Sequence, residues 1–129
     1  MRRLLSVVVS VYNEEEALAQ FYQVTEGILN TISWDYELVF VNDGSRDQSL
    51  SILNRLADSN PKVKVVSFSR NFGHEAAMIA GIDYSQGDGI ICMDADLQHP
   101  PACIPEIIRR FEDGYEVINM VRTKNESAG

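Results

Sequence analysis

The sequence predicts an α/β fold, in which a doubly wound, mostly parallel sheet carries helices on both faces. Apolar runs rich in Val and Ile alternate along the chain with segments whose apolar residues recur at helical spacing. The runs mostly lack polar alternation, as expected of parallel strands that are covered on both faces. Alternation of strand and helix also implies right-handed crossovers. At 129 residues, a single domain spanning 1–129 is expected.

The apolar runs define five expected strands. They span residues 4–9, 37–41, 63–68, 89–93 and 116–121. Each is bounded by polar or turn-forming residues, which is typical of short buried strands.

Four helices are expected between these strands. Two are predicted to begin with capping boxes, Asn13 with Glu16 and Ser45 with Gln48. The third, at about residues 73–84, is rich in Ala and Gly, which suits close packing on a sheet. The fourth carries an apolar stripe that stops at Gly114 and consists of Ile104, Ile107, Ile108 and Phe111.

Composition narrows the class of function. The net charge is −8, and no basic face is visible, which argues against a nucleic-acid partner. No run approaches the roughly 20 apolar residues that span a bilayer, and no small-residue cleavage site follows the start, so a soluble cytoplasmic domain is expected. Cys92 and Cys103 lack metal-ligand spacing, and we expect both to be buried free thiols in a reducing compartment.

The most informative motif ends the fourth predicted strand. Asp94, Asp96 and Gln98 follow one another at every second position. Alternate side chains of an extended chain point to the same side, so these three oxygen ligands would project together. Such a set suits a hard divalent cation, Mg²⁺ or Mn²⁺. Helix capping with solvated loop charge is the alternative interpretation, and the abrupt end of a buried strand favours the metal site.

Two further loops are expected to converge with this one, because ligands of such sheets bind beyond the carboxyl ends of the strands. They are residues 10–14 and 42–46. Asp43 can accept hydrogen bonds from a nucleobase edge, while Gly44 and Ser45 suit a turn and a helix cap. Tyr12 can lie against a base or simply cover the edge of the sheet.

Basic side chains near these loops have several interpretations. Arg70, in the loop of residues 70–73, either frames a ligand pocket or pairs with a carboxylate. Arg122 follows the fifth strand and is a candidate for contact with a diphosphate. Of the two histidines, His99 is more consistent with a solvent-facing loop than with the metal site, and His74 is expected to start a helix without a chemical task.

Two phosphate-binding motifs are missing from the sequence. There is no G-x-G-x-x-G after the first strand and no G-x-x-x-x-G-K-[ST], which argues against dinucleotide binding and against a P-loop NTPase. Without a glycine-rich loop to bind phosphate, the negative charge of a phosphate group would have to be neutralised by a metal ion. This strengthens the case for Asp94 and Asp96.

Four segments, in this order, resemble glycosyltransferase family 2. They read VVVSVYNEE at residues 7–15, VNDGS at 41–45, RNFG at 70–73 and MDADLQHPP at 93–101. The resemblance runs over residues 4–123, and the last two segments are most similar to the branch that makes polyprenyl-phosphate sugars, as dolichyl-phosphate mannose synthase does.

The resemblance implies a GT-A fold, a UDP- or GDP-linked sugar donor, and inversion at the anomeric carbon. It assigns the nucleoside pocket to Tyr12, Glu14 and Asp43. It assigns the cation to Asp94, Asp96 and Gln98, with Asp94 also near the donor, and contact with the diphosphate to Arg122. The ion would stabilise charge on the departing diphosphate.

Two departures from the family bear on function. Ser10 stands where the family usually has proline. Family members continue with an acceptor-binding segment that carries the general base, and this branch often adds membrane helices. We therefore expect the general base beyond Gly129, a lipid phosphate acceptor, and action at the cytoplasmic face of a membrane.

Two other functions compete with the transferase. A non-catalytic module that binds nucleotide sugars is consistent with a missing general base. A phosphoryl-transfer enzyme with paired aspartates is less consistent, because no supporting lysine and hydroxyl set accompanies Asp94 and Asp96.

Overall fold

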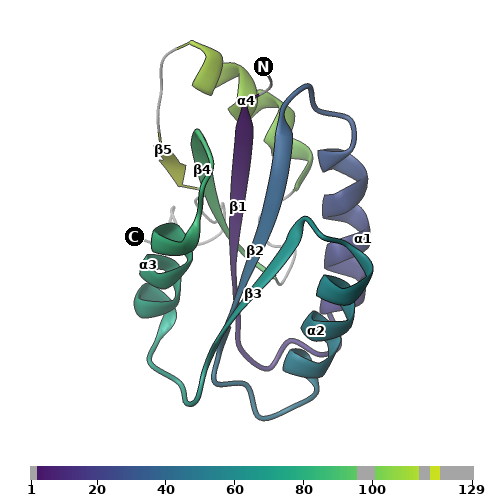
Figure 1. Ribbon diagram of the computed structural model, residues 1–129, viewed down its shortest axis with the longest axis vertical. Coiled ribbons are helices and arrows are strands. Elements are labelled where there is room, and N and C mark those ends of the chain that lie inside the picture. Colours follow the sequence, from purple (N-terminus) through teal and green to yellow (C-terminus); the bar gives the residue numbers. More distant parts are fainter. Residues whose placement is uncertain (1–2, 96–100, 114–116, 120–129) are drawn as a thin grey trace, which may run out of the picture.

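The computed structural model confirms the predicted α/β fold (Figure 1) and describes residues 3–95, 101–113 and 117–119, the last of these as backbone only. All four strand pairings between these residues are parallel, and the strand order is β3-β2-β1-β4-β5. The strands are β1 (Leu4–Val11), β2 (Asp35–Asp43), β3 (Val63–Phe68), β4 (Gly89–Asp94) and β5 (Val117–Asn119). β1 therefore lies at the centre, where the strand order reverses.

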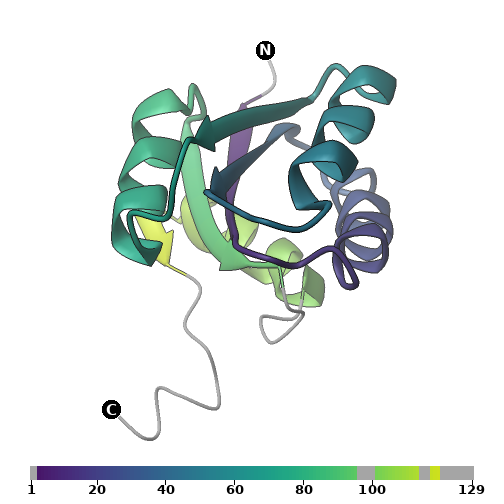
Figure 2. The same cartoon turned by 90° about the horizontal axis from the view of Figure 1, so that it is seen from below.

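Helices cover both faces of the sheet, as expected of a doubly wound fold (Figure 2). Helices α1 (Leu18–Leu29), α2 (Ser49–Ser59) and α4 (Ile104–Glu112) lie on one face, and α3 (His74–Tyr84) lies on the other. A short 3-10 helix, Pro101–Cys103, precedes α4. In the described part of the chain, no helix is long and apolar enough to cross a membrane.

The larger core lies between the sheet and α1, α2 and α4. Phe21 meets Phe40 edge to face at 6.3 Å, and Trp34 stacks on Phe111 at 5.7 Å. The predicted stripe of α4 is confirmed, because all four of its apolar residues are buried here. Aromatic pairs of this kind add to the stabilisation that comes from buried apolar area.

The smaller core lies beneath α3, where Ala77 packs on Val8, Val41 and Cys92. The close packing predicted for this Ala- and Gly-rich helix is confirmed at Gly81, since a Cβ there would lie 2.3 Å from Cγ1 of Val8. Burial raises the pKa of the Cys92 thiol. Cys103 is also a free thiol but is exposed, so its predicted burial was wrong.

Both predicted capping boxes are wrong. α1 begins at Leu18, five residues after Asn13, and α2 begins at Ser49, four residues after Ser45. The cause is that Asn13 and Ser45 use their side chains between the two loops: Oδ1 of Asn13 accepts the N–H of Arg46, and Oγ of Ser45 accepts the N–H of Asn13. These oxygens are therefore not available to the helix starts.

A buried carboxylate joins the sheet to the loop that follows α3. Oε2 of Glu37 accepts a hydrogen bond from Oγ of Ser6 at 2.6 Å and from the N–H of Gln86 at 2.7 Å. The N–H of Gly87 in turn donates to Oγ of Ser6 at 2.8 Å. We call Ser6, Glu37, Gln86 and Gly87 the amino-end cluster, because it lies near the amino ends of β1 and β2.

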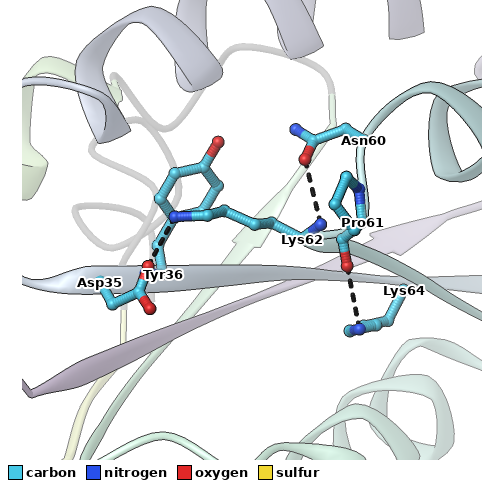
Figure 3. Close-up of polar contacts among 6 residues, drawn as sticks. All are labelled: Asp35, Tyr36, Asn60, Pro61, Lys62 and Lys64. Atoms are coloured by element: carbon cyan, nitrogen blue, oxygen red, sulfur yellow. Dashed lines mark hydrogen bonds and ion pairs between the residues drawn. The ribbon is translucent and has the colours of Figure 1, made fainter.

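More exposed polar contacts surround the starts of β2 and β3 (Figure 3). Nζ of Lys62 lies 2.5 Å from Oδ1 of Asp35, and the same ammonium group lies over the ring of Tyr36 at 4.6 Å. Nζ of Lys64 donates to the carbonyl of Pro61. Because the Lys62–Asp35 pair is about half exposed, it contributes little to stability.

Candidate functional site

The carboxyl ends of β1, β2 and β4 are neighbours in the sheet. In the parallel register Val11 lies opposite Asn42, and Ser10 lies opposite Asp94. Figure 1 shows this edge at the bottom, where the chain leaves β1 and β2 toward α1 and α2. The polar residues that follow these strands are thus brought to one edge of the sheet, where α/β proteins bind ligands.

Hydrogen bonds join the loop after β1 to the loop after β2. The N–H of Asn13 donates to Oγ of Ser45 at 2.9 Å, and Oδ1 of Asn13 accepts the N–H of Arg46 at 2.8 Å. Three more bonds run from the N–H of Glu14 to Oγ of Ser49, from the N–H of Glu15 to Oδ2 of Asp47, and from the N–H of Gln48 to Oε1 of Glu15. The two loops therefore form one connected rim.

The rim carries two of the residues predicted to line a nucleoside pocket. Tyr12 is 43% exposed. Glu14 is half-buried and donates its N–H to the second loop. Their predicted contact with a nucleoside stays a prediction.

Asp43, the last residue of β2, is buried and holds the loop between β3 and α3. Oδ1 accepts the N–H of Phe72 at 2.8 Å, and Oδ2 accepts the N–H of Gly73 at 3.1 Å and Nδ2 of Asn71 at 3.2 Å. We call Asp43, Asn71, Phe72 and Gly73 the carboxyl-end cluster. These bonds use much of the acceptor capacity of the carboxylate, and the predicted hydrogen bond from a nucleobase stays a prediction.

Gly44 brings this loop against the end of β2. Its φ is 70°, and a Cβ on it would lie 2.2 Å from the carbonyl carbon of Arg70. Only glycine suits both the backbone conformation and this approach. The guanidinium of Arg70 lies 4.7 Å from the ring of Phe72, and the Phe72 residue is 52% exposed. This loop therefore presents a cation and an aromatic residue next to the rim.

Asp94 ends β4 on the same face of the sheet as Asp43. Each lies two residues beyond a residue of the core under α3, Cys92 and Val41 respectively, and alternate residues of a strand share a face. Asp94 is buried, and its Oδ1 lies 2.8 Å from Nε2 of His74, the first residue of α3. His74 starts a helix, as expected, but its contact with Asp94, which joins residues 20 positions apart, was not predicted.

Four predicted residues lie outside the described part of the chain. They are Asp96, Gln98, His99 and Arg122. Among the residues that are described, no three His, Cys, Asp or Glu side chains are grouped as metal ligands. Asp94 itself fits a hard cation, because it supplies a carboxylate at a strand end and its orientation is fixed by a hydrogen bond.

A hollow of about 290 Å³ lies beside the rim and is lined by Asn13, Glu14, Glu15, Glu16, Ala17 and Asp47. Four of these six residues are acidic. Burial alone would raise the pKa of Asp47, but hydrogen bonds from Ser49 and Glu15 outweigh it and lower that pKa. Negative charge in the hollow disfavours a diphosphate that binds without a cation.

Solved structures resemble this chain in fold. A mannosyltransferase from Pyrobaculum calidifontis, in complex with GDP-Man and Mn²⁺, matches with a TM-score of 0.65 and 22% identity, over 74% of this chain and 28% of that one. S. aureus TarS 1–349 in complex with UDP-GlcNAc matches with a TM-score of 0.63 and 24% identity, over 74% of this chain and 27% of that one. The fold is GT-A, as the sequence predicts.

Curated relatives match almost the whole chain. An uncharacterized glycosyltransferase, YkcC of Bacillus subtilis, is 49% identical over 94% of this chain and 38% of its own length. A prophage bactoprenol glucosyl transferase homolog of Escherichia coli is 43% identical over 97% of this chain and 41% of its own length. The chain thus spans about two fifths of the length of these relatives.

The family model for glycosyl transferase family 2 matches residues 6–129, which include all four segments that carry the resemblance. The chain belongs to glycosyl transferase family 2.

Proposed function

We propose that this chain is the donor-binding part of a metal-dependent, inverting glycosyltransferase that takes a UDP- or GDP-linked sugar. The observation that carries this proposal is the pair of buried carboxylates, Asp43 and Asp94, at the carboxyl ends of two strands that flank β1. Both lie on the face that α3 covers, and both are bonded to residues at the start of that helix. Family membership supports the same proposal.

The proposed donor site extends from β1 to β4 along this edge. The nucleoside lies at Tyr12, Glu14 and Asp43, where the rim is connected and partly exposed. The diphosphate lies toward Asp94, with Arg122 as a further contact. Asp94, Asp96 and Gln98 are the proposed ligands of Mg²⁺ or Mn²⁺, and an ion bound there would supply positive charge to the departing diphosphate.

We propose a polyprenyl phosphate as the acceptor, at the cytoplasmic face of a membrane, and no nucleic acid as a partner. The relatives named bactoprenol glucosyl transferases support a lipid acceptor. Residues 1–129 are proposed to form one nucleotide-sugar-binding domain. The general base is assigned to the acceptor-binding segment that other members of the family carry, outside these residues.

Calorimetry tests this proposal. The chain is titrated with UDP, GDP, UDP-glucose and GDP-mannose, with and without Mn²⁺. We expect one nucleotide series to bind, with a clear gain in affinity from the metal that is lost in Asp94→Asn. Asp83→Asn is the matched control, since it removes an exposed carboxylate at the other end of α3 and leaves binding unchanged.

Two outcomes would change the proposal. If no nucleotide binds when Mn²⁺ is present, the chain is not a donor-binding domain. If a donor binds and neither transfer nor hydrolysis follows when acceptor lipid and the acceptor-binding segment are supplied, a non-catalytic nucleotide-sugar module is the correct function.

A further inference from the structure

We infer that His74 is a positioning residue, which fixes the Asp94 carboxylate for the cation and thereby sets the affinity of the donor site for metal. The inference rests on the proposed function, because it concerns the same site. No sequence motif marks His74 for this role. The contact that carries it is the 2.8 Å separation between Nε2 of His74 and Oδ1 of Asp94.

The direction of this hydrogen bond follows from chemistry. An ionised carboxylate can only accept, so a hydrogen bond to ionised Asp94 requires a His74 ring that carries a proton on Nε2. Residues that hydrogen-bond a metal-binding carboxylate orient it and tune its affinity for the ion. His74 would act on Asp94 in this way, without touching the metal or the substrate itself.

The backbone around His74 is held in place from two sides. Immediately before it, the N–H groups of Phe72 and Gly73 donate to Asp43. Further along α3, Gly81 lies against Val8 and Val41 of the sheet. Gly73 turns the chain into the helix with φ of 105°, a conformation that favours glycine. These contacts place His74 beside Asp94, and none of them involves the imidazole ring.

The exposure of the two side chains indicates that His74 contributes to the orientation of Asp94 more than to packing. The Asp94 side chain is 8% exposed, whereas the His74 side chain is 54% exposed. Removing the imidazole therefore costs little buried apolar area and leaves the helix start tied to Asp43. What is lost is the donor to Oδ1, and the effect should appear in metal-dependent binding rather than in folding.

The test compares three variants of the 129-residue chain. Mn²⁺ binding is measured by electron paramagnetic resonance in the presence of UDP and of GDP, and nucleotide binding without metal is measured by calorimetry. We expect His74→Ala to weaken Mn²⁺ binding about tenfold or more, with an unchanged unfolding midpoint and unchanged metal-free affinity. His74→Gln should recover most of the loss, because Nε2 of glutamine can donate from a similar position. Asp83→Ala, exposed at the far end of α3, should match the wild type.

Each failure has a distinct meaning. If the wild type binds Mn²⁺ with UDP or GDP and His74→Ala binds it equally well, the inference is wrong and the proposed function stands. If His74→Gln is as weak as His74→Ala, or if metal-free affinity and the unfolding midpoint fall in parallel with Mn²⁺ binding, a donor from Nε2 is not the cause and the inference is overturned. If the wild type binds neither nucleotide with Mn²⁺, the proposed function and the inference fall together.

Discussion

Each end of β2 carries a carboxylate that accepts backbone N–H groups next to α3. The two carboxylates differ in the residues that surround them. Glu37 and Asp43 lie six residues apart on one face of the strand, and both are buried. Glu37 accepts the N–H of Gln86, just after α3, and Asp43 accepts the N–H groups of Phe72 and Gly73, just before it. One strand therefore fastens both flanks of the helix with carboxylates.

The difference lies in the neighbours of each carboxylate. The amino-end cluster is closed by Ser6 and Gly87, where a Cβ on Gly87 would lie 2.4 Å from Oγ of Ser6. The carboxyl-end cluster instead includes an exposed aromatic residue, Phe72, and lies on the same edge of the sheet as Asp94. A buried, hydrogen-bonded carboxylate is thus not in itself a sign of function. Its position at the carboxyl edge of a parallel sheet is what connects it to a ligand site.

The largest effect is expected from Asp43→Ala. It leaves the N–H groups of Phe72 and Gly73 without their acceptor and frees the loop before α3. We expect a loss of about 2–4 kcal/mol in the free energy of unfolding and a large loss of nucleotide affinity. Urea denaturation and calorimetry measure the two. Asp35→Ala, which removes a half-exposed carboxylate from the start of β2, is the control and should leave nucleotide affinity unchanged. Intact nucleotide binding in Asp43→Ala would remove this residue from the site.

Glu37→Ala tests the other side of the comparison. It removes the acceptor of the buried Ser6 hydroxyl and of the partly buried N–H of Gln86, at a cost of about 2 kcal/mol in unfolding free energy. Nucleotide affinity should stay at the wild-type value, because the cluster lies at the far edge of the sheet. Glu37→Gln keeps an oxygen acceptor and should cost less in denaturant unfolding. A loss of nucleotide affinity in Glu37→Ala would show that the two ends of α3 are coupled.

The sequence predicts the framework of this molecule well. Runs of Val and Ile identify all five strands, and β3 has the predicted bounds because turn residues flank it on both sides. The α4 stripe is confirmed because apolar periodicity indicates which face of a helix is buried. The packing of α3 is confirmed because small residues let a helix lie close to the sheet. Polar strand ends likewise predict the edge of the sheet at which Asp43 and Asp94 both lie.

What the sequence does not predict depends on contacts between distant residues. Asn13 reads as a helix cap because its local pattern fits one, yet its side chain bonds Arg46, 33 positions away. Glu37 reads as a strand start, and its partner Gln86 is 49 positions away. His74 lies within hydrogen-bond distance of Asp94 in a fold in which α3 packs closely on the sheet. Local patterns carry no record of such pairings.

Gly81→Ala tests the packing of α3 on the sheet, between the carboxyl-end cluster and the amino-end cluster. The added Cβ would lie 2.3 Å from Cγ1 of Val8 and 3.0 Å from Cγ2 of Val41, so α3 must shift away from the sheet. We expect a cost of about 1.5 kcal/mol in unfolding free energy, and faster amide exchange at both flanks of the helix. Gly27→Ala, where a Cβ meets nothing within 4 Å, is the matched control. Exchange that rises at one flank alone would show that the two clusters hold α3 independently.

The smallest effect concerns Asp47, which belongs to the rim and to neither cluster. Its carboxylate accepts the N–H groups of Ser49 and Glu15, and these bonds lower its pKa below the ordinary value of 3.8 despite the opposing effect of burial. A lowered folded-state pKa means that the stabilisation is complete well above pH 3.8 and is lost as the pH falls below that value. Because the group is largely solvated, we expect no more than about 0.5 kcal/mol.

Denaturant unfolding of the wild type and of Asp47→Asn, compared at pH 6 and near pH 3, isolates this contribution from that of the other acids. The two proteins should differ at the higher pH and converge at the lower one, since protonated Asp47 no longer offers an ionised acceptor. A difference that persists unchanged at low pH would instead assign the effect to the geometry of the side chain. In that case the rim would be held by the shape of the Asp47 side chain and by neutral hydrogen bonds, and not by the charge of its carboxylate.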